Sequence, residues 1–105
     1  MAKLESLNGK VVWITGASSG IGKAVAQECA SQGAQVVLTA RRFEELENVR
    51  LSLPNPDQHL SVISDITDET QVEKAYAKVL ENKGRIDWLI NNAGLSQRAL
   101  IADTT

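Results

Sequence analysis

The sequence has little cysteine, no long apolar run and almost no surplus of charge. Cys29 is the single cysteine among 105 residues, which excludes an internal disulfide and the small disulfide-stabilised secreted domains. No apolar run approaches the roughly 20 residues that a membrane-spanning helix needs. Eleven basic and thirteen acidic residues give a net charge of −2, so nothing in the balance points to a nucleic acid or a membrane as partner.

What is present is typical of one folded domain. Hydrophobic residues make up 43% of the chain, and the 23% of charged residues argue against a disordered segment. Residues 1–10 carry charges and lack the apolar stretch of a secretory signal, so we expect a cytoplasmic protein. No spacing of cysteine, histidine and carboxylate residues suggests a metal site, and we predict none.

The chain alternates two hydrophobic patterns along its length. Amphipathic helical patterns begin near Ile21, Phe43 and Val72. Nearly continuous apolar runs, typical of strands covered on both faces, occupy residues 11–15, 35–40, 60–64 and 86–90. The order β-α-β-α-β-α-β predicts an α/β fold, a doubly wound parallel sheet that is incomplete, with four strands and about three helices. After Asn91 we expect a loop.

Local signals mark where the predicted helices begin and end. Gly33 lies just past the first helix, and Pro54 ends the second and opens a surface turn. Asp68 followed by Gln71 resembles a capping box at the start of the third helix, and Gly84 lies just past its end.

A glycine-rich loop, residues 15–22, joins the first strand to the first helix. Glycines there allow a tight turn and a close approach of backbone to a pyrophosphate, which the helix N-terminus favours electrostatically. The spacing G-x-x-x-G-x-G differs from the G-x-G-x-x-G dinucleotide pattern. Glycines at a helix start also occur for steric reasons alone, but the position between an apolar strand and an amphipathic helix favours a phosphate site.

The sequence resembles the short-chain dehydrogenase/reductase (SDR) family in three motifs that follow one another in family order. Residues 15–22 (T-G-A-S-S-G-I-G) match its cofactor loop letter for letter. Residues 91–94 (N-N-A-G) match its second hallmark, and Asp65, after the third strand, matches a third. The resemblance extends from about Leu7 to the end of the chain, and it implies a Rossmann-like fold with a nicotinamide dinucleotide cofactor.

Family roles, transferred to the matching positions, imply three groups of cofactor-binding residues. Asp65 would accept a hydrogen bond from the adenine amino group, with Ile66 alongside the ring. The residues that would line the pocket near the ribose and nicotinamide are Asn91, Ala93 and Gly94. Those that would surround the phosphates and the adjoining ribose are Gly16, Ser18, Ser19, Gly20, Ile21 and Gly22. Structural roles stay open for Asp65 as a turn residue and for Asn91 as a brace of the sheet.

The end of the second strand predicts NADP(H) as the preferred cofactor. A dinucleotide fold recognises the adenosine ribose there, with an acid for a 2′-hydroxyl or an arginine for a 2′-phosphate. Ala40 stands where family members that select NAD carry the acid, and Arg41 and Arg42 follow with two guanidinium groups.

Two observations keep NAD(H) possible. Ser19 stands where many NADP-preferring members have a basic residue. The two arginines can also be the solvated start of a helix, facing the acidic residues Glu44, Glu45 and Glu47.

Catalytic residues are not expected within the chain. Catalysis in this family depends on a serine and on a tyrosine four residues before a lysine, which lowers the tyrosine's pKa. The single tyrosine, Tyr76, is followed four residues later by Leu80 and lies on an apolar helix face, so we predict a core residue. Ser96 comes too early to be the catalytic serine.

Two further residues invite a functional interpretation that we do not favour. His59, the only histidine, lies in a polar turn before a strand, and we expect it to be exposed in that loop. Cys29 aligns with Ile21 and Val25 on the inward helix face and is expected to act as a small hydrophobic residue.

The leading hypothesis is that residues 1–105 form the N-terminal NAD(P)-binding segment of one SDR domain and end before its catalytic half. The parent would transfer a hydride between nicotinamide and a small-molecule alcohol or carbonyl, and would be a homo-oligomer, whereas this segment alone would be inactive. A naturally short nucleotide-sensing module is the alternative, and a structural domain that binds nothing is the third. Without later helices, we expect apolar sheet to be exposed around Trp88 and Ile90 and to favour self-association.

Overall fold

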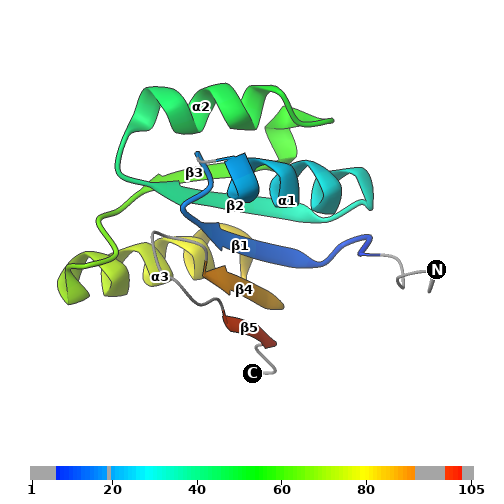
Figure 1. Cartoon of the computed structure of the whole chain (residues 1–105). Helices are drawn as coiled ribbons and strands as arrows, with labels where there is room; N and C mark the ends of the chain where they lie inside the picture. The colour runs from blue at the N-terminus through cyan, green and yellow to red at the C-terminus, as the bar shows by residue number, and fades with distance from the viewer. Residues whose placement is uncertain (1–6, 19, 92–98, 103–105) are drawn as a thin grey trace.

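The computed structural model describes residues 7–18 and 20–91, together with the backbone of residues 99–102. Strands and helices alternate in the predicted order (Figure 1). None of the helices in the described ranges is long and apolar enough to cross a bilayer. The elements are β1 (Val11–Thr15), α1 (Gly20–Ser31), β2 (Gln35–Ala40), α2 (Phe43–Leu51), the 3₁₀ turn η1 (Pro56–Gln58), β3 (Leu60–Ile63), α3 (Glu69–Lys83), β4 (Trp88–Asn91) and β5 (Ala99–Ala102).

The strands form one sheet in the order β3-β2-β1-β4-β5. β1 pairs in parallel with both β2 and β4, and β2 pairs in parallel with β3, so the predicted doubly wound parallel sheet is confirmed. β5 lies where we expected only loop, antiparallel to β4, with Leu89 opposite Ile101. An antiparallel neighbour needs only a short return of the chain, whereas each parallel neighbour needs a helical crossover.

Helices cover both faces of the sheet, which explains the uninterrupted apolar runs. Figure 1 shows α1 and α2 on one face and α3 on the other. On the first face Ile14 and Leu38 pack with Leu46 of α2; on the second, Trp13 and Val37 pack with Val79 of α3. Every residue of β1 is buried because its side chains enter two cores in alternation.

The helix ends follow the local signals in the sequence. The Asp68 carboxylate accepts hydrogen bonds from the backbone N–H groups of Thr70 and Gln71 at the start of α3. Gly84 ends the same helix with a φ of 81°, a left-handed conformation that favours glycine. The helix start at Asp68 and the helix end at Gly84 are therefore confirmed, whereas Gln71 does not complete the predicted capping box, because its Oε1 accepts the Asp65 N–H instead of the Asp68 N–H.

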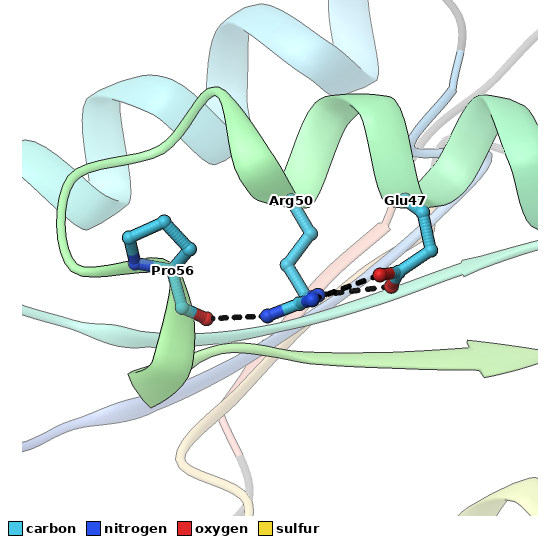
Figure 2. Close-up of polar contacts among 3 residues, drawn as sticks. All are labelled: Glu47, Arg50 and Pro56. Carbon is cyan, nitrogen blue, oxygen red and sulfur yellow. Dashed lines mark hydrogen bonds and ion pairs between the residues drawn. The ribbon is translucent and has the colours of Figure 1, made fainter.

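His59 is buried, and the expectation of an exposed loop histidine is wrong. Its side chain is 6% exposed, its Nδ1 accepts the Val36 N–H at 3.0 Å, and its Nε2 donates to the Pro54 carbonyl at 2.8 Å. The His59 ring therefore accepts a backbone hydrogen bond from β2 at the position directly before β3. Nearby, Arg50 joins Glu47 to the Pro56 carbonyl (Figure 2).

The predictions for Tyr76, Trp88 and Ile90 need correction. Tyr76 is 41% exposed, although its ring packs against Trp13 with the centroids 6.2 Å apart. Trp88 and Ile90 are half-buried, because they pack against the core beneath α1 and α2. The apolar hollow lies on the α3 face instead, as a cavity of about 370 Å³ lined by Trp13, Tyr76 and Leu89 among others. Self-association stays a prediction.

Candidate nucleotide-binding site

The predicted site residues gather at one edge of the sheet. β1 to β4 are parallel, so the segments that follow them emerge on the same side. The segments after β1, β2 and β3 begin at Gly16, Arg41 and Ser64, and Asn91 is the last residue of β4 at the same edge. A ligand-binding crevice at the carboxyl ends of the strands is the general property of open α/β sheets.

The glycine loop has the shape of a phosphate cradle. Gly16 has a φ of 66°, which turns the chain sharply away from β1. A Cβ on Gly22 would lie 2.3 Å from the Gly16 carbonyl oxygen, so the close approach of α1 to the loop depends on glycine there. By contrast, a Cβ on Gly20 would meet nothing within 4 Å. The loop therefore packs tightly on its inner side and leaves open space at the helix start, as a bound pyrophosphate requires.

The N-terminus of α1 differs electrostatically from those of the other two helices. The first turns of α2 and α3 carry acidic residues, Glu44 and Glu45 in one and Glu69 in the other, whereas the first turn of α1 carries none. The N–H groups of a helix's first turn have no partners within the helix, and its dipole attracts negative charge. Because the first turn of α1 carries no acidic side chain, its N-terminus is suited to an anion such as a phosphate.

Ile21 points outward, which contradicts the inward face expected from its spacing with Val25 and Cys29. Its side chain is 58% exposed, whereas Cys29 is buried and its thiol has a pKa raised by that burial. The buried residues of α1 are Gly22, Ala26, Cys29 and Ala30, so Ile21 lies beside the buried face of the helix and not on it. Ser18 is half-buried in the loop, and Ser19 lies outside the described residues.

Arg41 and Arg42 are both exposed directly after β2. Arg42 lies 3.3 Å from Glu45, with 79% of its side chain exposed, so the alternative of a solvated helix start is partly realised. Glu47 pairs with Arg50 instead. Arg41 makes no hydrogen bond or ion pair to any residue that the structure describes, which leaves its guanidinium available at the end of β2.

Asp65 is held in a turn directly after β3. Its Oδ1 accepts the backbone N–H of Thr67 at 3.0 Å and the Thr67 hydroxyl at 2.6 Å. These two bonds, and more weakly the positive charge of Arg41, hold the pKa of the Asp65 carboxyl below its usual value. The lowered pKa favours the ionised carboxylate, and Arg41 follows the neighbouring strand β2 at the same edge of the sheet. Asp65 is therefore a turn residue, as one of our alternatives expected, and its second carboxylate oxygen, Oδ2, has no hydrogen bond within the described residues.

Asn91 connects the last parallel strand to the first. Its Oδ1 accepts a hydrogen bond from the Thr15 hydroxyl at 2.9 Å, which ties the end of β4 to the end of β1. Asn91 and Ile66 both line the cavity on the α3 face. Ala93 and Gly94 lie outside the described residues. Asn91 therefore braces the sheet, as one of our alternatives expected, at the rim of the crevice.

Sequence reasoning missed three residues that shape the site. Thr15 fixes Asn91, and Thr67 and Gln71 fix Asp65, since Gln71 Oε1 accepts the Asp65 N–H at 2.8 Å. The Asp-x-Thr spacing after a strand was an available signal, because such a pair forms a local side-chain turn. Gln71 was noticed only as part of a helix cap.

The fold and the glycine cradle together define an α/β nucleotide-binding domain of the Rossmann type. The family model described as short chain dehydrogenase matches residues 10–105, and the chain belongs to this family.

Relatives agree with this assignment. The chain is 46% identical over 104 residues to human "Dehydrogenase/reductase SDR family member 7", covering 94% of this chain and 31% of that protein. It is 38% identical over 101 residues to "Fatty acyl-CoA reductase" of Acinetobacter baylyi, covering 95% and 34%. The chain spans about a third of the length of these curated relatives.

Solved structures show the same fold. A short chain dehydrogenase from Bacillus anthracis superposes with a TM-score of 0.79 at 43% identity, over 85% of this chain and 36% of that one. A 3-ketoacyl-(acyl-carrier-protein) reductase from Brucella melitensis, complexed with NADH, gives 0.74 at 38% identity, over 80% and 34%. SDR oxidoreductases thus share this architecture, and such neighbours bind nicotinamide cofactors.

Proposed function

We propose that this chain forms the NADP(H)-binding part of a short-chain dehydrogenase/reductase. In the parent enzyme, a hydride passes between the nicotinamide and the carbonyl or alcohol carbon of a small substrate. The chain lacks a tyrosine four residues before a lysine, so the proton chemistry belongs to residues outside it. We expect the 105 residues alone to bind the dinucleotide without catalysing its reaction.

The observation that carries this proposal is a phosphate cradle beside two exposed arginines. The Gly20 end of α1 offers open space and an uncompensated dipole, and the end of β2 lies beside β1 in the sheet. Ala40 supplies no carboxylate that would bind a free 2′-hydroxyl or repel a 2′-phosphate. Arg41 and Arg42 supply charge and planar donors that suit a phosphate.

The test is a calorimetric titration of the full chain with NADPH and, separately, with NADH. We expect NADPH to bind at least about tenfold more tightly, since a charge-assisted bond to phosphate contributes roughly 1.5–3 kcal/mol. Arg41→Ala should remove most of this preference and leave the affinity for NADH nearly unchanged. Lys78→Ala, which removes one positive charge from the exposed surface of α3, is the matched control. Tighter binding of NADH by the unaltered chain would overturn the NADP(H) assignment.

A further inference from the structure

Nearly every polar group of Asp65 makes a hydrogen bond within the segment of residues 65–71. Its N–H donates to Gln71 Oε1 at 2.8 Å, and its carbonyl accepts the Asp68 N–H at 3.0 Å. Its Oδ1 accepts both donors of Thr67. Within the described residues, Oδ2 is the polar atom of Asp65 that has no hydrogen bond. One carboxylate oxygen is therefore presented outward by a turn that fixes the rest of the residue.

Gln71 departs from the capping box that its spacing predicts. In a capping box, the side chain three residues into the helix accepts the N–H of the capping residue, here Asp68. That N–H already donates to the Asp65 carbonyl, so Gln71 reaches three residues further back and accepts the Asp65 N–H instead. The first turn of α3 thereby holds the backbone at the end of β3, a contact that the helix cap itself does not need.

We propose that Gln71 is a positioning residue for Asp65 in the recognition of the adenine amino group, an inference that rests on the proposed function. Thr67 fixes the carboxylate, and Gln71 fixes the backbone from which it projects. An exposed aspartate without these bonds would rotate between several conformers and lose entropy on binding. The three bonds from Thr67 and Gln71 remove that cost in advance, so Gln71 acts on the ligand through Asp65 without touching it.

The test compares two ligands that differ at the atom Asp65 would recognise. NADPH carries the adenine amino group, and its hypoxanthine analogue carries a carbonyl oxygen there. We expect the unaltered chain to prefer NADPH at least about tenfold, the usual effect of one hydrogen bond to a charged group. Gln71→Met keeps the length of the side chain and removes the acceptor. It should lower the preference by roughly threefold or more, through weaker binding of NADPH alone.

Matched variants separate positioning from general stability. Gln71→Glu keeps an acceptor oxygen and should retain the preference, and Gln27→Met places the same substitution on the exposed surface of α1 and should leave it unchanged. If Gln71→Met does not fold by circular dichroism, Gln71→Ser, too short to reach the Asp65 N–H, replaces it. A Gln71→Met or Gln71→Ser chain that folds and keeps the full preference would overturn the proposal.

The outcomes also distinguish this proposal from the function on which it rests. If the unaltered chain binds neither dinucleotide, the proposed function fails and this inference fails with it. If the chain binds both dinucleotides equally, nucleotide binding stands, but Asp65 does not recognise the adenine amino group and the positioning role is refuted.

Discussion

The two edges of the sheet use their polar side chains in opposite ways. At the amino edge, where the parallel strands begin, His59, Arg50 and Lys83 each donate to a backbone carbonyl of the turn before β3. At the carboxyl edge, Arg41 and one oxygen of Asp65 have no hydrogen bond within the described residues. Groups satisfied inside the fold stabilise it, whereas groups left available can bind a ligand. We therefore expect the amino edge to contribute stability and propose that the carboxyl edge contributes recognition.

Asp87 is a further amino-edge residue whose carboxylate oxygens are hydrogen-bonded within the fold. Its Oδ2 accepts the Val11 N–H at 2.8 Å, and Arg85 donates to both of its carboxylate oxygens. Hydrogen bonds from Arg85 hold the pKa of the Asp87 carboxyl below its usual value, although partial burial opposes them. This carboxylate thus closes the start of β1, and nothing in its surroundings resembles the open Gly20 end of α1.

Two glycines of one loop give the largest expected difference. In Gly22→Ala the new Cβ would overlap the Gly16 carbonyl oxygen, so we expect a loss of about 3 kcal/mol in the free energy of unfolding. In Gly20→Ala the Cβ meets no protein atom, and stability should change by less than about 0.5 kcal/mol. NADPH titration should nevertheless show weaker binding by Gly20→Ala, since the methyl group enters the phosphate space. Unchanged affinity in that variant would place the phosphate elsewhere.

At the amino edge, His59→Ala should destabilise the fold and leave the affinity for NADPH nearly unchanged. The substitution leaves the buried N–H of Val36 and the carbonyl of Pro54 without the ring, a loss of roughly 2 kcal/mol in urea unfolding. Because His59 lies at the opposite edge from the cradle, the affinity of the folded chain for NADPH should stay within about twofold of the unaltered value. A tenfold loss of affinity would show that the two edges are coupled.

The same histidine should make stability depend on pH. Burial lowers the pKa of the His59 imidazole below its usual 6.5, the charges of Lys83 and Arg50 lower it further, and its bond to the Pro54 carbonyl opposes them. The unfolded chain therefore takes up the proton first. The contribution of neutral His59 to the free energy of unfolding is fully present above about pH 6.5. It should decrease as the pH falls toward the pKa of His59 in the folded chain, by up to about 1.4 kcal/mol per pH unit.

Unfolding by urea at pH 7.5 and pH 5.5 measures this dependence. His59→Gln does not titrate and should flatten it, while the carboxylates Asp65 and Asp87, whose ordinary pKa is 3.8, lose their contribution only at lower pH. An equally steep pH dependence in His59→Gln would assign the proton uptake to another group.

Two arginine–glutamate pairs with the same spacing give the smallest expected difference. Arg50 donates twice to Glu47 and once to the Pro56 carbonyl, with about a fifth of each charged side chain exposed, whereas the pair of Arg42 and Glu45 is mostly solvated. Arg50→Lys should cost about 1 kcal/mol through loss of the planar donor geometry, and Arg42→Lys less than about 0.5 kcal/mol. Thermal unfolding of both variants measures the difference. Equal losses would remove the contrast between the edges.

The features that the sequence predicts correctly depend on neighbouring residues. The order of strands, the cap at Asp68 and the end of α3 at Gly84 follow from hydrophobic period and turn chemistry. The failures concern environments made by distant segments. His59 is buried because its ring meets Val36, 23 residues earlier in the chain, and Ile21 is exposed because the face of α1 that packs on the sheet is the one with Gly22 and Ala26.

The candidate site was predictable by motif but not by geometry. The spacing of glycines indicated a phosphate loop, and the resemblance supplied Asp65 and Asn91. No local pattern could show that Gln71 would accept the N–H of Asp65 and not that of Asp68. Which of the two it accepts depends on how the end of β3 approaches α3. The position of Arg41 beside Asp65 likewise follows from the pairing of β2 with β3.

The central claim is that the carboxyl edge binds the dinucleotide and the amino edge does not. The most direct test is to titrate the isotopically labelled full chain with NADPH and follow the backbone amide resonances by NMR. We expect saturable shifts at Gly20, Arg41 and Asp65, with Val36 and Asp87 unchanged. Shifts centred on the amino edge, or none at millimolar NADPH, would contradict it.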